Sequence, residues 1–440
     1  MSSIDPASAL IERLRRREAR VAVIGLGYVG LPLAVSLASA GLPVAGIDID
    51  GARVAAVNTG RSPVADVAEA TLGPLIAAGR LAAANNYDAL DDADVAIICV
   101  PTPLSKTRDP DISHIIAATD EIAAHARPGR LVVLESTTYP GTTEEIVLPR
   151  LAAGGARVGQ DFFLAFSPER IDPGNAVYRL DNTPKVLGAI TPACHAVAAA
   201  LYALAVRQVV PVSNARTAEM VKLLENTFRA VNIGLINEVA LMCHRLGVDV
   251  WEVIEAARTK PYGFMPFYPG PGLGGHCIPL DPYYLAWKLR TLDYTARFIE
   301  LAGEVNAAMP RHVVEMVADA LNGRRLAVNG AAVLLLGVAY KPNVADTRES
   351  PALDIARLLR AKGATVAYHD PYVPTLPLGE ETLASVPLDA ARLSAADCAV
   401  VVTAHGCIDW AQVAAHAGLI VDTRNALGGR TTRPGQVVRL

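Results

Sequence analysis

A cysteine behind a glycine-rich loop is the residue of this 440-residue chain best suited to covalent chemistry. The segment 269–282 reads PGPGLGGHCIPLDP, with four glycines in positions 270–275 and Cys277 two residues later. Glycines leave backbone amides bare, so the phosphates of a ligand can approach them closely. A thiol has a pKa near ~8.5, so Cys277 needs neighbours that favour its thiolate. Asp281 would face the same side as the sulfur if this segment is helical.

The alternative for Cys277 is a buried thiol that only packs, because cysteine is among the most buried residue types. A dinucleotide signature lies upstream, however, and a redox cofactor with a nucleophilic thiol is a chemically coherent pair. We therefore expect Cys277 to be a catalytic nucleophile.

The dinucleotide signature is the motif GLGYVG at 25–30. A strand predicted over 20–24 precedes it, a helix over 31–40 follows, and a second strand over 43–47 ends at Asp48. This order makes the motif specific, with the helix-start amides binding a pyrophosphate and Asp48 accepting from the adenosine ribose. Because an acid there repels a 2'-phosphate, the predicted cofactor is NAD. The predicted cofactor-binding residues of this region are Gly25, Gly27, Tyr28, Val29, Gly30, Asp48 and Arg53.

Three further buried strands are predicted, over 94–100, 131–135 and 162–166, and each ends in a polar loop. The carboxyl ends of strands in a doubly wound sheet face the cofactor. We therefore expect contacts to the nicotinamide side of NAD, although ordinary strand-ending turns are the alternative. The residues concerned are Pro101, Thr102 and Thr137. The third strand leads to the neighbouring pair Glu169 and Arg170.

A helix of roughly 30 residues is predicted from the capping residue Asn214 to Leu246, before Gly247. At 1.5 Å per residue it would be ~45 Å long, so we expect it to bridge two domains and to pair with a copy of itself. Lys222 and Asn226 lie one turn apart on one face of it. Their apolar neighbours favour a buried pair over a solvated lysine.

The last third of the chain repeats the order of the first. Strands are predicted over 333–336, 364–368 and 397–403, with a helix over 350–361. The turn GVAYK at 337–341 replaces the glycine signature, so we expect a nucleotide fold adapted to a different ligand. Arg348, in the segment that caps the helix, could reach a phosphate.

These elements predict an α/β protein of two Rossmann-like, doubly wound domains joined by a long central helix and a helical middle domain. We expect an NAD-binding domain over 1–212, a central helical domain with the cysteine loop over 213–323, and a C-terminal Rossmann-like domain for a different ligand over 324–440. A length of 440 residues and a hydrophobic content of 52% fit such a protein.

Charge and cysteine usage exclude several classes of function. A net charge of -4 argues against nucleic acid as a partner. The basic run 13–17 is interpreted as a solvated helix face. No apolar run reaches the ~20 residues of a membrane span, and no signal peptide is expected. Six scattered cysteines without zinc spacing indicate reduced thiols, no metal site and a cytoplasmic location.

With these motifs in order, the chain resembles the UDP-glucose/GDP-mannose dehydrogenase family along nearly all of its length. The segment KPYGFMPFY at 260–268 looks most like the bacterial UDP-N-acetylglucosamine 6-dehydrogenases. The motifs that carry the family resemblance are Gly25-Leu26-Gly27-Tyr28-Val29-Gly30, Ser167-Pro168-Glu169, Lys222 with Asn226, Gly274-Gly275-His276-Cys277 with Asp281, and Asp346-Thr347-Arg348-Glu349-Ser350.

The resemblance implies a four-electron oxidation of the sugar C6 alcohol to a carboxylate, with two NAD in succession. Cys277 would attack the aldehyde formed first, and a thiolate is suited to that step because hydride loss from an aldehyde requires a tetrahedral adduct. Lys222 and Asn226 would stabilise the oxyanion, and Asp281 and Glu169 would move protons or activate water. Which of Lys222, Asp281 and Glu169 takes the first alcohol proton stays open.

The family correspondence also implies that the C-terminal domain, 324–440, binds the UDP-sugar, and it places substrate and cofactor contacts. Arg348 would reach the NAD of the first domain. Some relatives have a second acid where Pro173 stands, and the arginine that several supply from a neighbouring subunit could correspond to Arg258 or be replaced by Lys260. The substrate-binding residues that the resemblance implies are Glu169, Arg170, Lys222, Asn226, Tyr268, Gly272, Gly274, Tyr340 and Lys341.

The resulting hypothesis is a cytoplasmic NAD-dependent nucleotide-sugar 6-dehydrogenase, a homodimer or larger homo-oligomer, that oxidises UDP-N-acetylglucosamine for surface polysaccharide. UDP-glucose, UDP-N-acetylmannosamine and GDP-mannose are rival substrates. A two-electron alcohol dehydrogenase with a packing thiol and a non-catalytic nucleotide-sugar sensor are the alternatives of other classes.

Overall fold

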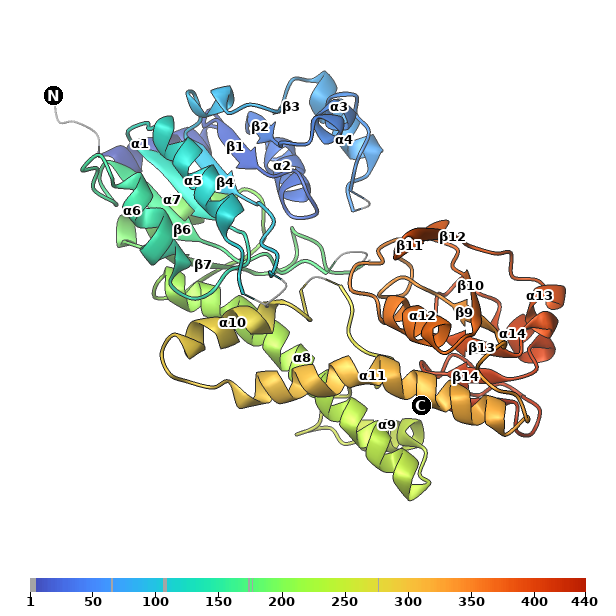
Figure 1. Ribbon diagram of the computed structural model, residues 1–440. Helices are drawn as coiled ribbons and strands as arrows, with labels where there is room; N and C mark the ends of the chain where they lie inside the picture. The colour runs from blue at the N-terminus through green and yellow to red at the C-terminus, as the bar shows by residue number, and fades with distance from the viewer. Residues whose placement is uncertain (1–4, 65, 106–108, 173–174, 176, 276) are drawn as a thin grey trace. The chain divides into compact units, whose positions relative to one another are not determined.

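The computed structural model describes residues 5–440 except 65, 106–108, 173–174, 176 and 276 (Figure 1). His276 of the cysteine loop and Pro173 therefore lie outside the described residues. Contacts divide the chain into two compact units, Met1–Glu225 with Tyr283–Asp293, and Asn226–Pro282 with Tyr294–Leu440. Each unit has its own hydrophobic core.

The first unit is built on an eight-stranded sheet in the order β3-β2-β1-β4-β5-β6-β7-β8. All neighbouring strands are parallel except β6 and β7. The order of β3 through β6 is that of a dinucleotide-binding fold, as expected. The strands are β1 (Val21–Ile24), β2 (Val44–Ile47), β3 (Leu81–Ala84), β4 (Val95–Ile98), β5 (Arg130–Leu134), β6 (Phe162–Phe166), β7 (Lys185–Ala189) and β8 (Val209–Pro211).

Both faces of this sheet are covered, which explains why its strands read as continuous apolar runs. Val21 and Val23 of β1 belong to one core cluster, whereas Ala22 and Ile24 belong to another. The helical segments around the sheet are α1 (Pro6–Arg15), α2 (Gly30–Ser39), α3 (Gly51–Asn58), α4 (Glu69–Ala77), η1 (Asp88–Leu90), α5 (Ser113–Ala124), η2 (Thr143–Val147), α6 (Leu148–Leu151) and α7 (Pro192–Tyr202).

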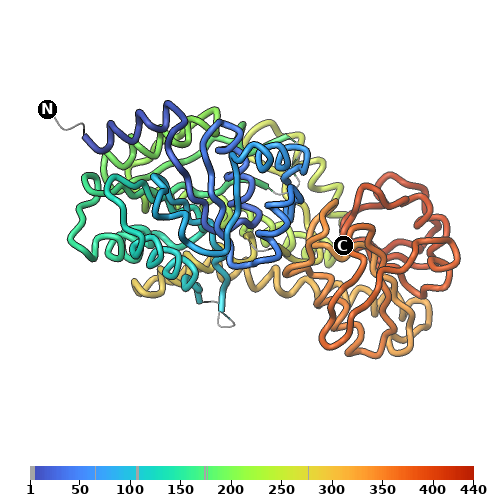
Figure 2. Tube along the Cα trace, turned by 90° about the horizontal axis from the view of Figure 1, so that it is seen from above, coloured from blue at the N-terminus to red at the C-terminus, as the bar shows by residue number. Residues whose placement is uncertain are grey.

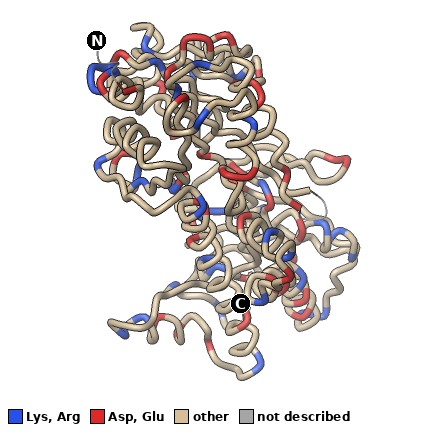
Figure 3. Tube along the Cα trace, turned by 90° about the vertical axis from the view of Figure 1, so that its left-hand side faces the viewer, with Lys and Arg blue, Asp and Glu red and all other residues tan. Residues whose placement is uncertain are grey.

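The basic run 13–17 is only partly a solvated face: Arg15 and Arg16 are exposed, whereas Arg13 and Arg17 are half-buried. Arg16 pairs with Glu12 at 2.9 Å, and Arg13 pairs with Asp94 at 2.5 Å. Figure 3 shows the wider pattern, with Lys and Arg interspersed among Asp and Glu along the chain. Among the described residues, no helix is both long and apolar enough to cross a bilayer.

The predicted long helix is α8 (Ala215–Leu246), followed by α9 (Val250–Arg258), α10 (Asp281–Arg290) and α11 (Arg297–Asn322). Asn214 caps α8 as expected, because its Oδ1 accepts from the backbone N–H of Thr217 at 2.8 Å. The helices α8 and α11 cross closely (Figure 1), since a Cβ on Gly234 would lie 3.1 Å from the Cα of Ala302.

A second parallel sheet has the order β10-β9-β13-β14-β15, which confirms the predicted repeat. Its strand β9, which lies between β10 and β13, again alternates between two cores, with Val333 in one and Leu334 in the other. The chain from 332 onward is drawn in orange to red in Figure 2. Its elements are β9 (Ala332–Leu336), α12 (Pro351–Ala361), β10 (Thr365–His369), β11 (Thr375–Leu378), β12 (Glu381–Ala384), α13 (Ala390–Ala395), β13 (Cys398–Val401), α14 (Trp410–His416), β14 (Ile420–Asp422) and β15 (Val437–Arg439).

Candidate active site

The turn between β1 and α2 contains two glycines that the protein itself requires. A Cβ on Gly25, whose φ is 94°, would lie 2.4 Å from the carbonyl oxygen of Cys99, and one on Gly30 would lie 1.8 Å from that of Gly25. A Cβ on Gly27 would meet no described atom within 4 Å. The space before Gly27 therefore fits a ligand that approaches the backbone closely, as a pyrophosphate does.

The start of α2 suits an anion. Val29 stands at the N-cap and makes no side-chain capping bond, and the first turn contains no acidic residue. The amides at this end thus carry the partial positive charge of the helix without a protein carboxylate to neutralise it. These features fit the pyrophosphate of NAD.

Asp48 follows β2 and is 6% exposed. Its Oδ2 accepts from the backbone N–H of Leu26 at 2.8 Å and pairs with Arg53 at 2.9 Å. Its Oδ1 accepts from the backbone N–H of Asp50 at 2.9 Å. A carboxylate oxygen can accept more than one hydrogen bond, so Oδ1 has capacity for a ribose hydroxyl.

Thr102 and Thr137 follow β4 and β5, which are neighbouring parallel strands. Their loops are held in place: Tyr284 Oη donates to the carbonyl of Thr102 at 2.7 Å, and Ser136 Oγ donates to that of Val100 at 2.8 Å. Both threonines are half-buried, whereas Pro101 is exposed. The structure thus brings these predicted contacts to the same edge of the sheet as the glycine turn.

Glu169 points into the protein. Its Oε1 accepts from the backbone N–H groups of Arg170 at 2.7 Å and Ile171 at 2.6 Å, and its Oε2 pairs with Lys185 at 3.3 Å. Three donors on one carboxylate hold it in a single orientation at the end of β6. The guanidinium of Arg170 is itself paired with Glu225 of α8 at 2.6 Å.

Lys185 joins Glu169 to a second buried acid that the sequence analysis does not single out. Its ammonium lies 2.8 Å from Oε2 of Glu135, whose other oxygen, Oε1, accepts from Tyr202 Oη. Burial raises the pKa of Glu135, partly offset by Lys185. Burial alone would lower the pKa of Lys185, but Glu135 and Glu169 together raise it. A lysine inside an apolar strand is the one signal in the sequence that could have revealed this network.

Lys222 lies on α8 and is 8% exposed. Within the described chain, no carboxylate forms an ion pair with it. A buried ammonium normally requires an anionic partner. Lys222 is therefore suited to a negatively charged oxygen of a ligand or a reaction intermediate.

The second unit contains Cys277, Asp281 and Asn226. The backbone N–H of Asp281 donates to the carbonyl of Cys277 at 2.8 Å, so the chain winds into α10 as expected. Asn226 Nδ2 donates to Oδ2 of Asp281 at 2.5 Å, and both residues are buried. Two predicted catalytic residues are thus in contact, one helical turn from the half-buried thiol.

The space beside the glycines before Cys277 is occupied by other residues of the protein, so these glycines are not bare as expected. A Cβ on Gly274 would lie 2.7 Å from Cβ of Tyr340, and one on Gly272 would lie 3.3 Å from Cγ of Pro351. Asn237 Oδ1 also accepts from the backbone N–H of Gly270 at 2.9 Å. The loop needs glycine to lie against the turn that carries Tyr340.

The remaining predicted ligand contacts are engaged within the protein. Arg348 forms a paired contact with Asp346, with distances of 3.0 and 2.5 Å to Oδ2. Tyr268 stacks on Trp251 with ring centroids 6.2 Å apart, and its hydroxyl donates to Glu255 at 2.8 Å. Lys341 lies 5.9 Å from the ring of Tyr340.

Arg424, which follows β14, packs on this loop and is a further residue that the sequence analysis misses. A Cβ on Gly270 would lie 2.3 Å from its Nη1, and its Nε donates to the carbonyl of Val402 at 3.0 Å. Burial lowers the pKa of Arg424 to about 10. No motif marks Arg424, because more than a hundred residues separate it from the loop it packs on.

The sequence matches the three parts of one family, the UDP-glucose/GDP-mannose dehydrogenases. The NAD binding domain matches residues 19–206, the central domain 216–308 and the UDP binding domain 334–429. The structure agrees with these matches: it contains a glycine turn that fits NAD, a central helical region with a cysteine loop and a second nucleotide fold. The chain therefore belongs to the UDP-glucose/GDP-mannose dehydrogenase family, and its cofactor is NAD.

Two relatives of similar sequence are named for N-acetylated sugars. The chain is 38% identical to UDP-N-acetyl-D-glucosamine 6-dehydrogenase of Pseudomonas aeruginosa, over 81% of this chain and 84% of that protein. It is 39% identical to UDP-N-acetyl-D-mannosamine dehydrogenase of Pyrococcus horikoshii, over 80% and 84%.

A solved structure of UDP-D-ManNAc dehydrogenase from Pyrococcus horikoshii has a TM-score of 0.84 at 36% identity, covering 94% of this chain and 98% of that one. The NDP-N-acetyl-D-galactosaminuronic acid dehydrogenase of Methanosarcina mazei has a TM-score of 0.81 at 31% identity, covering 100% and 98%.

Proposed function

We propose that this protein oxidises the C6 alcohol of UDP-N-acetylglucosamine to the uronic acid in two NAD-dependent steps. The observation that carries the proposal is the arrangement of Cys277, which starts the helical turn ending at Asp281, with Asp281 hydrogen-bonded to Asn226. Asn226 follows Lys222 by one turn of α8. A thiol one helical turn from an acid that is bonded to an amide suits covalent oxidation of an aldehyde.

The proposed chemistry begins with removal of a proton and a hydride from the C6 alcohol, which gives the aldehyde. Cys277 Sγ then adds to the aldehyde carbon, and the carbonyl oxygen becomes the oxyanion of a thiohemiacetal. Lys222 and the second N–H of the Asn226 amide stabilise that oxyanion. When bound, NAD accepts one hydride in each oxidation.

Loss of the second hydride converts the thiohemiacetal to a thioester on Cys277. Water then adds to the thioester carbon, the carbon–sulfur bond breaks, and the carboxylate leaves while the sulfur regains its proton. Asp281 is the proposed acceptor of the water proton. Glu169 holds its strand end through three donors, which supports an orienting role for it over a mobile proton carrier.

Substrate choice rests on the relatives, which act by name on UDP-N-acetylglucosamine, UDP-N-acetylmannosamine or an N-acetylgalactosamine derivative. The shared feature is an N-acetylated hexose on a nucleotide. We choose UDP-N-acetylglucosamine among them, with the uronic acid destined for surface polysaccharide.

The experiment is a stoichiometry with a thiol variant. The purified protein is given UDP-N-acetylglucosamine and excess NAD, and NADH and acid are counted. Two NADH per acid are expected, and Cys277→Ser should stop acid formation while NAD binding stays intact. One NADH per sugar with an aldehyde product would reject the thioester route.

A substrate panel tests the choice of sugar. UDP-glucose, UDP-N-acetylmannosamine and GDP-mannose are compared with UDP-N-acetylglucosamine by kcat/KM. A preference for UDP-glucose would reject an N-acetylated substrate.

We also propose that α8 mediates a homodimer in the cytoplasm. One stripe of exposed apolar side chains follows the helix at spacings of four and seven residues, which at 100° per residue keeps it within an arc of ~80°. Such a stripe on a long helix fits a copy of itself. The stripe consists of Met220, Leu224, Phe228, Leu235, Met242 and Leu246.

The dimer is tested by sedimentation of Leu235→Glu. A charge in the middle of the stripe should yield monomers, whereas Arg229→Glu, an exposed position on the opposite side of α8, should leave the dimer intact. Equal masses for both variants would reject this interface.

The proposed cytoplasmic location is supported by the six cysteines, none of which is in a disulfide, as expected in a reducing compartment.

A further inference from the structure

Glu219 is a fully buried carboxylate on α8, three residues before Lys222. Buried acids are rare unless they are well bonded. Both oxygens of Glu219 are bonded to a single loop: the backbone N–H of Gly141 donates to Oε2 at 2.5 Å, and Thr143 donates to Oε1 through its backbone N–H at 2.9 Å and its hydroxyl at 2.6 Å.

The loop held by Glu219 is the one that carries Thr137. It begins at Ser136, whose hydroxyl is bonded to the end of β4, and it ends at Thr143, where η2 begins. The loop is therefore tied at one end to the neighbouring strand and at the other end to α8. Residues three apart on a helix are neighbours, so the bonds of Glu219 also fix the side of α8 that carries Lys222.

We propose that Glu219 is a positioning residue that sets the place of Lys222 relative to Thr137 during oxidation of the sugar. This inference rests on the proposed function, in which Lys222 meets the reacting oxygen and Thr137 the nicotinamide. A displacement of about 1 Å between reacting groups can cost about a hundredfold in rate, so a rigid tie here has catalytic value.

The donors around Glu219 favour its ionised form. The backbone N–H groups of Gly141 and Thr143 can only donate, and each faces one oxygen of Glu219. A proton on the carboxyl would therefore oppose one of these N–H groups or require the Thr143 hydroxyl to turn from donor to acceptor. Burial raises the pKa of Glu219 to about 7, against the lowering effect of Thr143 and Gly141. The tie should therefore weaken as the pH falls through about 7.

Four charged side chains lie near the contact between Glu219 and the loop, and they form ion pairs with one another. Arg216 of α8 pairs with Glu144 at 2.7 Å and with Glu145 at 3.4 Å. Lys288 of α10 pairs with Glu145 at 2.7 Å. Glu144 adds to the raised pKa of Glu219.

The first test compares Glu219→Gln with Glu144→Gln, a nearby acid that makes no bond to the loop amides. The glutamine amide turns N–H groups toward a donor, so it mimics the protonated carboxyl. At pH 8 we expect kcat of Glu219→Gln to fall about tenfold or more, with KM for both substrates within about twofold. The acid limb of kcat near pH 7 should disappear in Glu219→Gln, whereas in Glu144→Gln it should remain and move to lower pH, because Glu144 raises the pKa of Glu219.

The second test uses hydrogen exchange of the Gly141 and Thr143 amides, which needs no turnover. Exchange should be faster in Glu219→Gln and in Thr143→Val, and Thr143→Ser should restore protection because it keeps the hydroxyl. The control Glu144→Gln should exchange as the wild type does.

The outcomes separate this inference from the proposed function. A wild-type protein that oxidises no nucleotide sugar overturns both. A wild type that turns over, with Glu219→Gln and Glu144→Gln alike in kcat and in pH profile, overturns the role of Glu219 alone.

Discussion

The two nucleotide folds of this chain start their first turns in the same way and then diverge. Gly25 and Gly337 both have positive φ, and a Cβ on either would strike a carbonyl oxygen at the end of the neighbouring strand, at 2.4 and 2.1 Å. In the first fold α2 begins at Gly30. In the second fold α12 begins only at Pro351, so the turn amides do not lie at a helix start.

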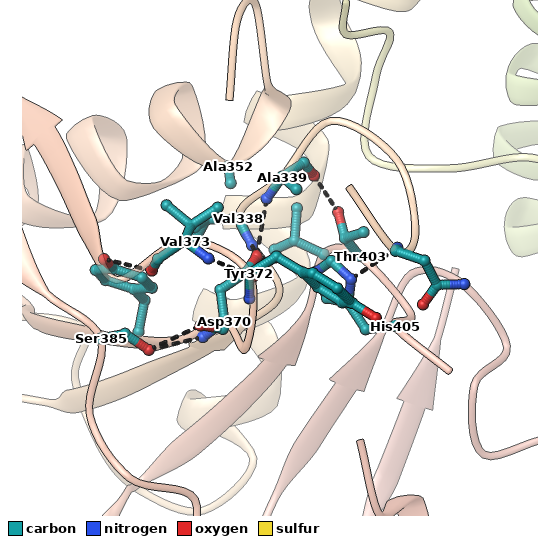
Figure 4. A network of polar contacts seen from close by, with 12 residues as sticks. Val338, Ala339, Ala352, Asp370, Tyr372, Val373, Ser385, Thr403 and His405 are labelled. Carbon is teal, nitrogen blue, oxygen red and sulfur yellow. Dashed lines mark hydrogen bonds and ion pairs between the residues drawn. The ribbon is translucent and has the colours of Figure 1, made fainter. Parts of the chain in front are cut away.

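The two folds also differ in how the acid after their second strand, Asp48 or Asp370, binds the amides of the turn. Asp48 in the first fold receives one turn amide, from Leu26, and pairs with the half-exposed Arg53. Asp370 in the second fold receives the turn amides of Val338 at 2.7 Å and Ala339 at 3.0 Å (Figure 4). It thus occupies the amides that the first fold offers to a cofactor.

His405 also binds to this turn region, through Asp370 and through the backbone of Asn343. Its Nε2 lies 2.9 Å from Oδ2 of Asp370, and its Nδ1 accepts from the backbone N–H of Asn343 at 3.0 Å. Since Nδ1 is an acceptor, the ring is neutral and Nε2 carries the hydrogen. The comparison teaches that one fold keeps its turn for a ligand, whereas the other uses it to brace the segment that contains Tyr340 and Lys341.

The largest loss of stability is expected from removing Asp370, the acid that binds the turn of the second fold. Asp370→Ala leaves His405 and the surrounding buried amides without an acceptor, so the free energy of unfolding should fall by about 3–5 kcal/mol. Asp48→Ala should cost less, about 1–3 kcal/mol, because fewer donors depend on it. Urea denaturation of both variants measures the difference, and equal losses would contradict the comparison.

The glycines of the first turn give the next effect. Gly30→Ala should lower the free energy of unfolding by about 3 kcal/mol, since its Cβ meets the Gly25 carbonyl. Gly27→Ala should change it by less than about 0.5 kcal/mol. Its methyl group would nevertheless fill the space before the backbone, so NAD affinity should fall at least about tenfold. Calorimetry with NAD reads affinity, and an unchanged Kd for Gly27→Ala would reject the assigned ligand space.

A smaller effect is expected at the ion pair of the first turn. Arg53 is 36% exposed in its side chain, so Arg53→Ala should lower the free energy of unfolding by at most about 1 kcal/mol. Thermal unfolding without NAD measures this loss. A loss as large as that of Asp370→Ala would mean that the first turn is braced like the second.

The smallest effect is a difference in acid stability. Burial would raise the pKa of Asp370, but His405 and the backbone donors hold the pKa below its usual value. This carboxylate therefore contributes stability above its unfolded pKa, and the contribution is lost as the pH falls through its lower folded pKa. Asp370→Asn should flatten that part of the stability profile, and an unchanged slope between pH 5 and 2 would argue against the assignment.

Regular elements could be predicted wherever the apolar pattern was uninterrupted. The strand expected over 162–166 is β6 residue for residue, and the helix expected from Asn214 to Leu246 is α8 with Asn214 as its cap. The segment after Cys277 also forms the turn on which the argument for Asp281 depends, since the backbone N–H of Asp281 donates to the carbonyl of Cys277. These features depend on neighbours in the sequence, which a pattern can report.

The supporting residues could not be predicted because their partners are distant in the chain. Glu219 meets a loop 76 residues away at Thr143, and His405 meets Asp370 35 residues away. A single polar residue in an apolar run has no spacing that marks it. The glycines before Cys277 had a pattern, but it could not show that Tyr340 fills the space beside them.

The six thiols differ in accessibility, and that decides how the sulfur of interest can be labelled. Cys99 and Cys398 are buried, and burial raises the pKa of both, in Cys398 to about 12, so alkylating reagents should pass them by. Cys407 is exposed and will compete for the reagent. A Cys407→Ser background is therefore the natural starting material for any probe attached at Cys277.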